Sequence, residues 1–333
     1  MGWGACSFDG GLRRLVQVMG LAQRLANAID LTSFFTTLET AQASWLYYFL
    51  DSIARGERLA AYAPDKLSHG ARFLDVGCGY GGSLIAAHHK GMKVHGIEID
   101  QKALAGAQAL LAERQIDAMV TDDNIYGAGF DRFPAMDLIV CENVIEHVDD
   151  PRSFMRRMFD KLAPGGSLVM EIPNGVALRS VASDPHYALP FLSLLSYQSA
   201  SRVFADVIGK DVCGDGYSVG DYFPLSWYLD VIPSTVARHS VQFRNDAIMQ
   251  PLAVAETLDE MHKKLLDIDG IFSDVSPLLR ENLRVSAQYY IDKAMLDCQT
   301  LTEESLTRVP VDANGPAARY LAAAWSVRFD HLP

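Results

Sequence analysis

Between residues 72 and 174, short apolar runs alternate with stretches of helical periodicity. This alternation is typical of β-α-β units, and therefore of a parallel sheet with helices on its faces. The apolar runs predict five strands, at 72–76, 93–99, 118–121, 137–141 and 167–172. The helical periods predict helices at 81–90, 101–114 and 151–162. Pro164-Gly165-Gly166 predicts a turn between the last helix and the last strand.

The segments on either side of this core have a different pattern of apolar and polar residues. Two helical patterns precede this core at 12–29 and 37–62, and an irregular stretch rich in aromatic residues and glycine follows at 175–223. Further on, the pattern predicts a helix at 225–231, a strand at 236–243 and a helical pair at 252–267 and 278–297. The final apolar run, 320–329, fits an edge strand or, because of its alanines, a helix.

We therefore predict an α/β fold with a doubly wound, mostly parallel, Rossmann-like sheet of about seven strands. The predicted partition is a helical N-terminal cover (1–65), a core (66–250) with an insertion at 175–223, and a C-terminal part (251–333) holding the helical pair and the final edge strand. The insertion and the flanks are expected to form a lid whose aromatic residues wall an acceptor pocket: Tyr187, Tyr217, Tyr222, Phe223 and Trp227.

Composition narrows the class of partner. The chain has 333 residues and carries 29 basic against 41 acidic side chains, a net charge of −12, which disfavours binding to nucleic acid. Its five cysteines are scattered without a C-x-x-C pair, so neither a disulfide framework nor a zinc site is expected. The absence of a secretory signal and of a long apolar run predicts a cytoplasmic protein without stable membrane insertion.

The most informative stretch is residues 73–83, FLDVGCGYGGS, where a predicted strand is followed directly by a glycine-rich turn. Glycines allow a tight turn and a close approach of ligand to backbone. Gly77, Gly79 and Gly82 also satisfy the dinucleotide pattern G-x-G-x-x-G, with Glu98 where its ribose-binding acid falls. The glycine pattern alone is therefore ambiguous between cofactors.

Four further motifs resolve the ambiguity. Besides Asp75 before the glycines, the chain has GIEID at 96–100, TDD at 121–123, DLIVCENVIEHV at 137–148 and LAPGGSLVMEIPN at 162–174. Together they resemble the class I S-adenosylmethionine-dependent methyltransferases, and within them the branch of the quinone-biosynthesis O-methyltransferases and their small-molecule and sugar-modifying relatives. The resemblance covers residues 70–175, and a weaker resemblance extends over residues 222–243.

The resemblance implies S-adenosylmethionine as cofactor and assigns its contacts. Asp75, Gly77, Cys78 and Gly79 would hold the methionine half. The other implied contacts follow the second, third and fourth strands: Glu98 to the ribose hydroxyls, Ile99 against the adenine, Asp122 or alternatively Asp123 to the adenine amino group, and Glu142 at the carboxyl edge of the sheet.

The expected reaction is methylation of a small-molecule acceptor, with a hydroxyl favoured by the resemblance. We expect His147 or His186 to act as the proton acceptor, and no metal ion. Structural roles compete with this one: the Glu146-His147 pair could cap the next helix or fix a loop, and His186 could be a solvated loop residue.

Three alternatives stay open. One is methylation of nitrogen or carbon on a metabolite or sugar. Another is an NAD-dependent oxidoreductase, since Tyr289 and Lys293 match a Tyr-x-x-x-Lys pair with Ser276 upstream. The third is a non-catalytic subunit that binds S-adenosylmethionine, and a homodimer is likewise left open.

Overall fold

The computed structural model describes residues 54, 56–58, 69–209, 217–243, 248–302 and 310–333. The helix expected at 12–29, and most of the one expected at 37–62, lie outside the described residues. The chain divides into two compact units, Met1–Leu138 and Ile139–Pro333. This division falls inside the span 66–250 that the sequence analysis treats as one core.

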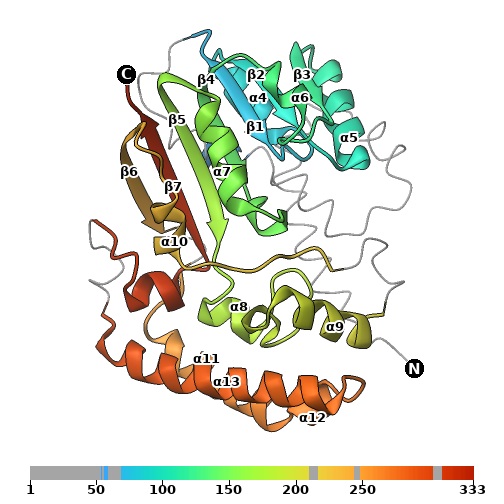
Figure 1. Cartoon of the computed structure of the whole chain (residues 1–333), viewed down its shortest axis with the longest axis vertical. Coiled ribbons are helices and arrows are strands. Elements are labelled where there is room, and N and C mark those ends of the chain that lie inside the picture. Colours follow the sequence, from blue (N-terminus) through green and yellow to red (C-terminus); the bar gives the residue numbers. More distant parts are fainter. Residues whose placement is uncertain (1–53, 55, 59–68, 210–216, 244–247, 303–309) are drawn as a thin grey trace. The chain divides into compact units, whose positions relative to one another are not determined.

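Seven strands form one mixed sheet in the order β3-β2-β1-β4-β5-β7-β6 (Figure 1). β2 pairs in parallel with β1 and with β3, whereas β7 pairs antiparallel with β5 and with β6. Apart from β7, this is the strand order of a doubly wound dinucleotide-binding fold. The predicted α/β class and the strand number are confirmed.

The first unit contains the regular β-α-β pattern. Its elements are β1 (Arg72–Val76), α4 (Gly82–His89), β2 (Lys93–Ile97), α5 (Gln101–Glu113), β3 (Ala118–Thr121), α6 (Ala128–Asp131) and the start of β4 (Met136–Glu142). Helix α5 begins where the side chain of Asp100 accepts hydrogen bonds from the N–H groups of Lys102 and Ala103. This cap fixes the loop between the carboxyl end of β2 and α5.

The second unit holds the rest of the sheet and most of the helices. Its elements are η1 (Ile145–His147), α7 (Pro151–Asp160), β5 (Leu162–Pro173), α8 (Leu178–Ala182), η2 (Leu192–Leu194), α9 (Tyr197–Val207), α10 (Leu225–Asp230), β6 (Val236–Phe243), α11 (Ala253–Leu266), α12 (Ile268–Ile271), α13 (Pro277–Asp297), η4 (Cys298–Thr300), η5 (Ala317–Leu321) and β7 (Ala324–His331). Helices α8, α9 and α11 to α13 gather beyond the carboxyl end of β5 (Figure 1).

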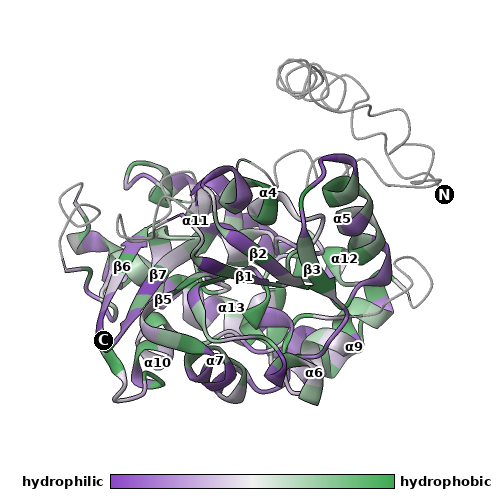
Figure 2. Ribbon diagram, turned by 90° about the horizontal axis from the view of Figure 1, so that it is seen from above, coloured by the Kyte–Doolittle hydropathy of each residue, from purple (hydrophilic) through white to green (hydrophobic). Residues whose placement is uncertain are grey.

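Helix α7 shows how the pattern of side chains places a helix. Phe154, Met155, Met158 and Phe159 are buried, while Arg156 is exposed. Both hydrophobic and hydrophilic colours therefore appear along α7 in Figure 2. Spacings of three and four residues put the four apolar side chains on one face of the helix, and this face packs on β5.

The C-terminal strand corrects one expectation. The run 320–329 was expected to form an edge strand or a helix, but β7 lies between β5 and β6, and β6 is the edge strand. A π-helical turn, η5, precedes it. Asn174 fixes this turn to the end of β5, because its buried Nδ2 donates to the carbonyl groups of Ala318, Arg319 and Ala322 at 3.0, 2.9 and 2.7 Å.

The expected Pro-Gly-Gly turn is also corrected. Residues 164–166 belong to β5, which begins at Leu162. Gly165 takes a φ of 74°, a left-handed conformation that glycine adopts without strain, and its N–H donates to the carbonyl of Leu332 at 2.9 Å. The segment therefore pairs at the sheet's end and does not form a separate turn.

Membrane insertion has no support from the helices in the described ranges. None of them combines the length and the apolar character needed to cross a bilayer.

Candidate active site

The glycine turn after β1 is a left-handed segment. Gly77, Gly79 and Gly81 have φ values of 79°, 51° and 81°. Only glycine occupies this region routinely. The N–H groups of Gly77 and Cys78 both donate to the carbonyl of Ile97, at 2.9 and 3.0 Å, so the turn is tied to the end of the neighbouring strand β2.

Glu98 closes this turn from the other side. One carboxylate oxygen accepts from the N–H of Gly79 at 2.7 Å, and the other accepts from the N–H of Asp100 at 2.8 Å. Burial raises the pKa of Glu98 and the nearby charge of Asp100 adds to this, although the backbone N–H groups oppose the shift. Glu98 thus stands directly beside the glycine turn, as the resemblance implies.

Two side chains next to Glu98 face solvent. Ile99 is 69% exposed, so its apolar side chain is accessible to a flat ring. Asp122 is exposed and accepts a 3.3 Å bond from Gln101. Asp123, in contrast, accepts from the hydroxyl of Thr121 at 3.0 Å and forms an ion pair with Arg132 at 3.3 Å.

These contacts distinguish Asp122 from Asp123, the two candidates for the contact to the adenine amino group. Asp123 already has two partners within its own loop, and an ideal Cβ on Gly129 would collide with its carboxylate at 1.6 Å. Asp122 is the more accessible acceptor of the pair, so the geometry favours Asp122.

Asp75 is buried at the end of β1 and accepts a hydrogen bond from the hydroxyl of Ser83, near the start of α4. The sequence analysis did not single out Ser83. Cys78 is also buried, and burial, reinforced by the charges of Asp75 and Glu98, raises the pKa of its thiol. A raised pKa keeps the thiol protonated, so Cys78 contributes its backbone to the turn and no nucleophile.

In the second unit, β4 ends at Glu142, and Asn143 follows in a left-handed conformation with φ of 52°. Asparagine tolerates this region better than most residues. The N–H of Asn143 donates to the carbonyl of Glu171 in β5 at 3.1 Å. This bend directs the chain into the short η1 helix.

The structure brings together the two histidines that the sequence offered as alternatives. The rings of His147 and His186 meet edge to face with centroids 5.2 Å apart. Glu146 Oε1 lies 3.7 Å from Nε2 of His147 and 4.0 Å from Nε2 of His186. We call Glu146, His147 and His186 the acid-histidine cluster. Three groups that could ligate a metal thus converge where no metal site was expected.

Backbone contacts hold this cluster in place. Nδ1 of His147 lies 2.9 Å from the carbonyl oxygen of Ser218, and the N–H of Gly220 donates to the carbonyl of Glu146 at 2.6 Å. The side chain of Asp184 accepts from the N–H groups of His186 and Tyr187, both at 2.9 Å. The sequence analysis missed Asp184 and Ser218. The helix-capping role weighed for Glu146-His147 belongs to Asp150, which caps α7.

Burial shifts the protonation of the cluster. It raises the pKa of Glu146 to about 8, with the charges of Glu171 and Glu142 adding to the effect. It lowers the pKa of His186 to about 4, to which His147 also contributes. Burial likewise raises the pKa of Asp184. Without a ligand, Glu146 and His186 are therefore mostly uncharged at neutral pH.

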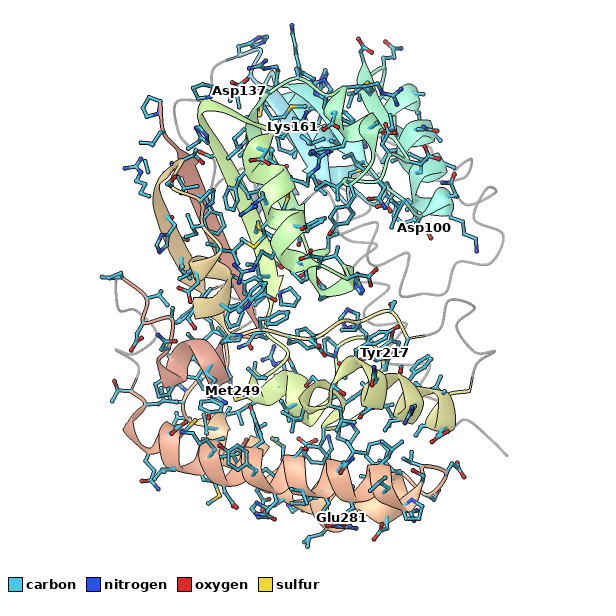
Figure 3. The ribbon with its side chains drawn as sticks, viewed as in Figure 1. Asp100, Asp137, Lys161, Tyr217, Met249 and Glu281 are labelled. Atoms are coloured by element: carbon cyan, nitrogen blue, oxygen red, sulfur yellow. The ribbon has the colours of Figure 1, made fainter. Side chains whose placement is uncertain are left out.

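The aromatic residues expected to wall one pocket make three different sets of contacts. Tyr187 and Tyr217 pack with Phe204 of α9, and Figure 3 labels Tyr217 beside this helix. Phe223 stacks on Trp227 with centroids 4.1 Å apart. The ring of Tyr222 lies against Gly175, where an added Cβ would meet it at 2.1 Å.

The residues that suggested a dehydrogenase have structural roles. Ser276 caps α13 by accepting from the N–H of Leu279. Lys293 binds Asp297 one turn further on, at 2.7 Å, and Tyr289 is 67% exposed. These partners leave no reason to assign Tyr289 and Lys293 a catalytic role.

Comparison with known proteins agrees with the motif resemblance. Residues 45–203 match a family model described as a methyltransferase domain. This segment is thus similar to methyltransferase domains, and S-adenosylmethionine is the cofactor that its motifs fit. The predicted resemblance is confirmed.

Sequence relatives include two enzymes called ubiquinone biosynthesis O-methyltransferase. The one from Pseudomonas entomophila (strain L48) is 30% identical over 105 residues, and the one from Azoarcus sp. (strain BH72) is 32% identical over 108 residues. Each alignment covers 32% of this chain and 45% of the relative, so the chain spans less than half the length of the relatives it matches.

Solved structures with a similar arrangement have low identity. A coclaurine N-methyltransferase bound to N-methylheliamine and SAH is 16% identical, with a TM-score of 0.45, covering 84% of this chain and 72% of that one. A geranyl diphosphate C-methyltransferase from Streptomyces coelicolor A3(2) is 14% identical, with a TM-score of 0.43, covering 84% and 76%. These scores are too low to carry any property over to this chain.

Proposed function

We propose that this chain transfers a methyl group from S-adenosylmethionine to a hydroxyl of a small-molecule acceptor. The observation that carries the proposal is the arrangement beside the glycine turn: Glu98 is bonded to Gly79, with Ile99 and Asp122 exposed next to it. A carboxylate, an apolar surface and a second carboxylate suit a ribose, an adenine ring and its amino group. The O-methyltransferase relatives support oxygen as the methylated atom.

In this proposal the chemistry is divided between the cofactor and the protein. S-adenosylmethionine supplies an activated methyl group whose leaving sulfur becomes neutral. The protein must then align the acceptor and assist loss of its hydroxyl proton. We assign this second task to the acid-histidine cluster, because its imidazole and carboxylate groups converge and are fixed by backbone contacts.

Glu98 provides the most direct test of cofactor binding. Glu98→Ala removes the acceptor for two ribose hydroxyls, at about 1.5–3 kcal/mol for each bond to a charged group, and should weaken affinity for S-adenosylhomocysteine roughly 10²–10⁴-fold. Isothermal titration calorimetry on the full chain measures this directly. Glu98→Gln keeps the shape and one acceptor oxygen, so its loss should be smaller.

Glu113→Ala is the matched control, because Glu113 is an exposed glutamate at the end of the neighbouring helix α5. It should leave affinity unchanged. Equal affinity in wild type and Glu98→Ala would refute the assignment of the ribose contact. Stabilisation by NADH, and none by S-adenosylhomocysteine, in a thermal shift experiment would instead restore the oxidoreductase alternative.

The acceptor class needs a separate assay. The full chain is incubated with S-adenosylmethionine and a panel of phenols, alcohols and amines, and methylated products are detected by mass spectrometry. Products methylated on oxygen support the proposal, and products methylated on nitrogen or carbon would redirect it. Cofactor binding without any turnover across a broad panel favours the non-catalytic subunit.

A further inference from the structure

The acid-histidine cluster has an arrangement that a hydroxyl substrate alone does not explain. Each of the three side chains offers one ligand atom, and these atoms all lie within 4.8 Å of one another. The Glu146 oxygen is 3.7 Å from one nitrogen and 4.0 Å from the other. Both distances exceed the roughly 3.2 Å limit of an N–H···O hydrogen bond, so the three atoms face each other without bonding directly.

The orientation of the imidazole rings specifies which nitrogen atoms are free. Nδ1 of His147 is 2.9 Å from the carbonyl oxygen of Ser218, and a carbonyl can only accept. Nδ1 therefore carries the hydrogen, and Nε2 presents a lone pair towards Glu146. His186 is oriented in the same way, since its Nδ1 faces Asp184 at 3.9 Å while its Nε2 faces Glu146.

This orientation is the one that metal-binding histidines adopt. A ligating imidazole usually directs its second nitrogen to a carbonyl or carboxylate, which fixes the tautomer and the ring. Ser218 occupies this supporting position for His147, at 2.9 Å. Asp184 faces Nδ1 of His186 at 3.9 Å, on the matching side of the ring but beyond hydrogen-bond distance. Two ligands about 2.1 Å from a tetrahedral ion lie about 3.4 Å apart, so the two distances from Glu146, 3.7 and 4.0 Å, would have to shorten towards this value on binding.

Burial supplies an independent observation. The side chain of Glu146 is only 2% exposed, and its Oε2 has no hydrogen-bond partner within the described residues. The buried hydroxyl of Tyr222 likewise lacks a partner there. Oε2 is not the oxygen that faces the histidines, but it belongs to the same buried carboxyl group, and burying a carboxylate without a compensating charge is costly. A cation coordinated through Oε1 would offset that cost.

We propose that Glu146, His147 and His186 bind one divalent transition-metal ion of the Mn²⁺ to Zn²⁺ series. Two imidazoles and one carboxylate suit these ions, whereas Mg²⁺ and Ca²⁺ prefer sites made of oxygen. Three protein ligands also leave coordination positions open. If the proposed methyl transfer is correct, an ion here would lower the pKa of an acceptor hydroxyl bound beside it, and both histidines would act as ligands and not as free bases.

The test uses the full chain, stripped of metal with EDTA and exchanged into metal-free buffer. Titration with MnCl₂, ZnCl₂ and MgCl₂ by calorimetry should give one site that prefers Mn²⁺ or Zn²⁺ over Mg²⁺. His186→Ala and Glu146→Gln should each lower the affinity at least about tenfold. The control His88→Ala removes an exposed histidine of α4 and should bind as wild type does.

Folding is checked in every variant by circular dichroism and by binding of S-adenosylhomocysteine. A second measurement uses Co²⁺, whose visible absorption reports imidazole ligation and should change in His147→Asn, a variant that retains a polar side chain. Absence of a site in the folded wild type would overturn the proposal, and so would equal affinity in His186→Ala. If the chain binds metal but not S-adenosylhomocysteine, the proposed methyl transfer is contradicted and the metal site is supported. If it binds S-adenosylhomocysteine but no metal, the metal site is refuted and the proposed methyl transfer is unaffected.

Discussion

The glycine turn of the first unit and the acid-histidine cluster of the second are built from contacts of very different sequence range. In the turn, Ser83 bonds Asp75 eight residues away, and Gly79 bonds Glu98 over 19 residues. In the cluster, His147 contacts Ser218 over 71 residues. The first arrangement depends on neighbouring strand ends, whereas the second depends on several segments of the insertion reaching their final positions.

This difference determines how each region should respond to substitution. A short-range turn follows from the sheet register that positions β1 beside β2, where Asp75 pairs with Gly96. The cluster instead depends on residues that hold the distant segments of the second unit. Asn174 is such a residue, because it connects the end of β5 to the turn before β7.

The largest effect on stability is expected from Asn174→Ala. The substitution removes a donor from the carbonyl groups of Arg319 and Ala322, and each group left without a partner costs about 1–3 kcal/mol. Ala318 loses the same donor but still accepts from the indole N–H of Trp325. We expect the free energy of unfolding to fall by about 3 kcal/mol or more. Chemical denaturation followed by circular dichroism measures this change.

Asn314→Ala serves as its control, since Asn314 is exposed in a turn and should change stability by less than about 0.5 kcal/mol. A loss below about 1 kcal/mol in Asn174→Ala would mean that the carbonyl groups of Arg319 and Ala322 find other partners. The stability of the second unit would then depend less on the contact between Asn174 and the turn before β7 than we expect.

The same contrast explains what the sequence could predict. The bounds predicted for β1, β3 and β6 agree with the structure, because short apolar runs between turn residues carry their own signal. The place of β7 was wrong, since its pairing between β5 and β6 depends on distant strands. For the candidate site, the motifs placed Glu98 beside the glycine turn, whereas no local pattern linked His147 to His186 or indicated Asp184 and Ser218.

An intermediate effect is expected from Gly96→Ala, which tests packing in the first unit. An ideal Cβ at this position lies 2.9 Å from Sγ of Cys78 and 3.0 Å from Cδ1 of Leu84. Overpacking of this kind costs about 1–3 kcal/mol. Because Cys78 belongs to the glycine turn, we expect lower affinity for S-adenosylhomocysteine together with the lower unfolding free energy.

The double variant Gly96→Ala with Cys78→Ala isolates the cause. Removal of Sγ eliminates the closest contact, so the pair should be more stable than the sum of the two single effects predicts. Additive losses would show that the clash with Leu84, or a shift of the strand itself, dominates. The glycine turn would then depend less on its nearest side-chain contacts than we expect for a region built from short-range contacts.

The smallest effect concerns a polar link in the first unit that joins residues far apart in the sequence. Arg72 bonds Asp137 across 65 residues, through its N–H at 2.7 Å and its side chain at 3.2 Å. Burial alone would raise the pKa of Asp137, but the bonds from Arg72 outweigh it and the net shift is downward from the ordinary value of 3.8. Since the carboxyl is 32% exposed, solvent screens the pair and its contribution should be about 1 kcal/mol.

The sign of the pH dependence follows from this lowered pKa. A carboxyl group whose pKa is lower in the folded chain contributes stability above its unfolded value, and loses it as the pH falls through the folded value. Asp137→Asn should therefore be about 1 kcal/mol less stable than wild type at pH 7, with the difference shrinking below about pH 4. The control Asp117→Asn, at an exposed position before β3, should track wild type throughout. Urea denaturation at a series of pH values measures both differences. If the difference in unfolding free energy between Asp137→Asn and wild type stays constant down to acid pH, the effect comes from side-chain packing and not from charge. The link between Arg72 and Asp137 would then not count as an electrostatic contact between residues far apart in the sequence.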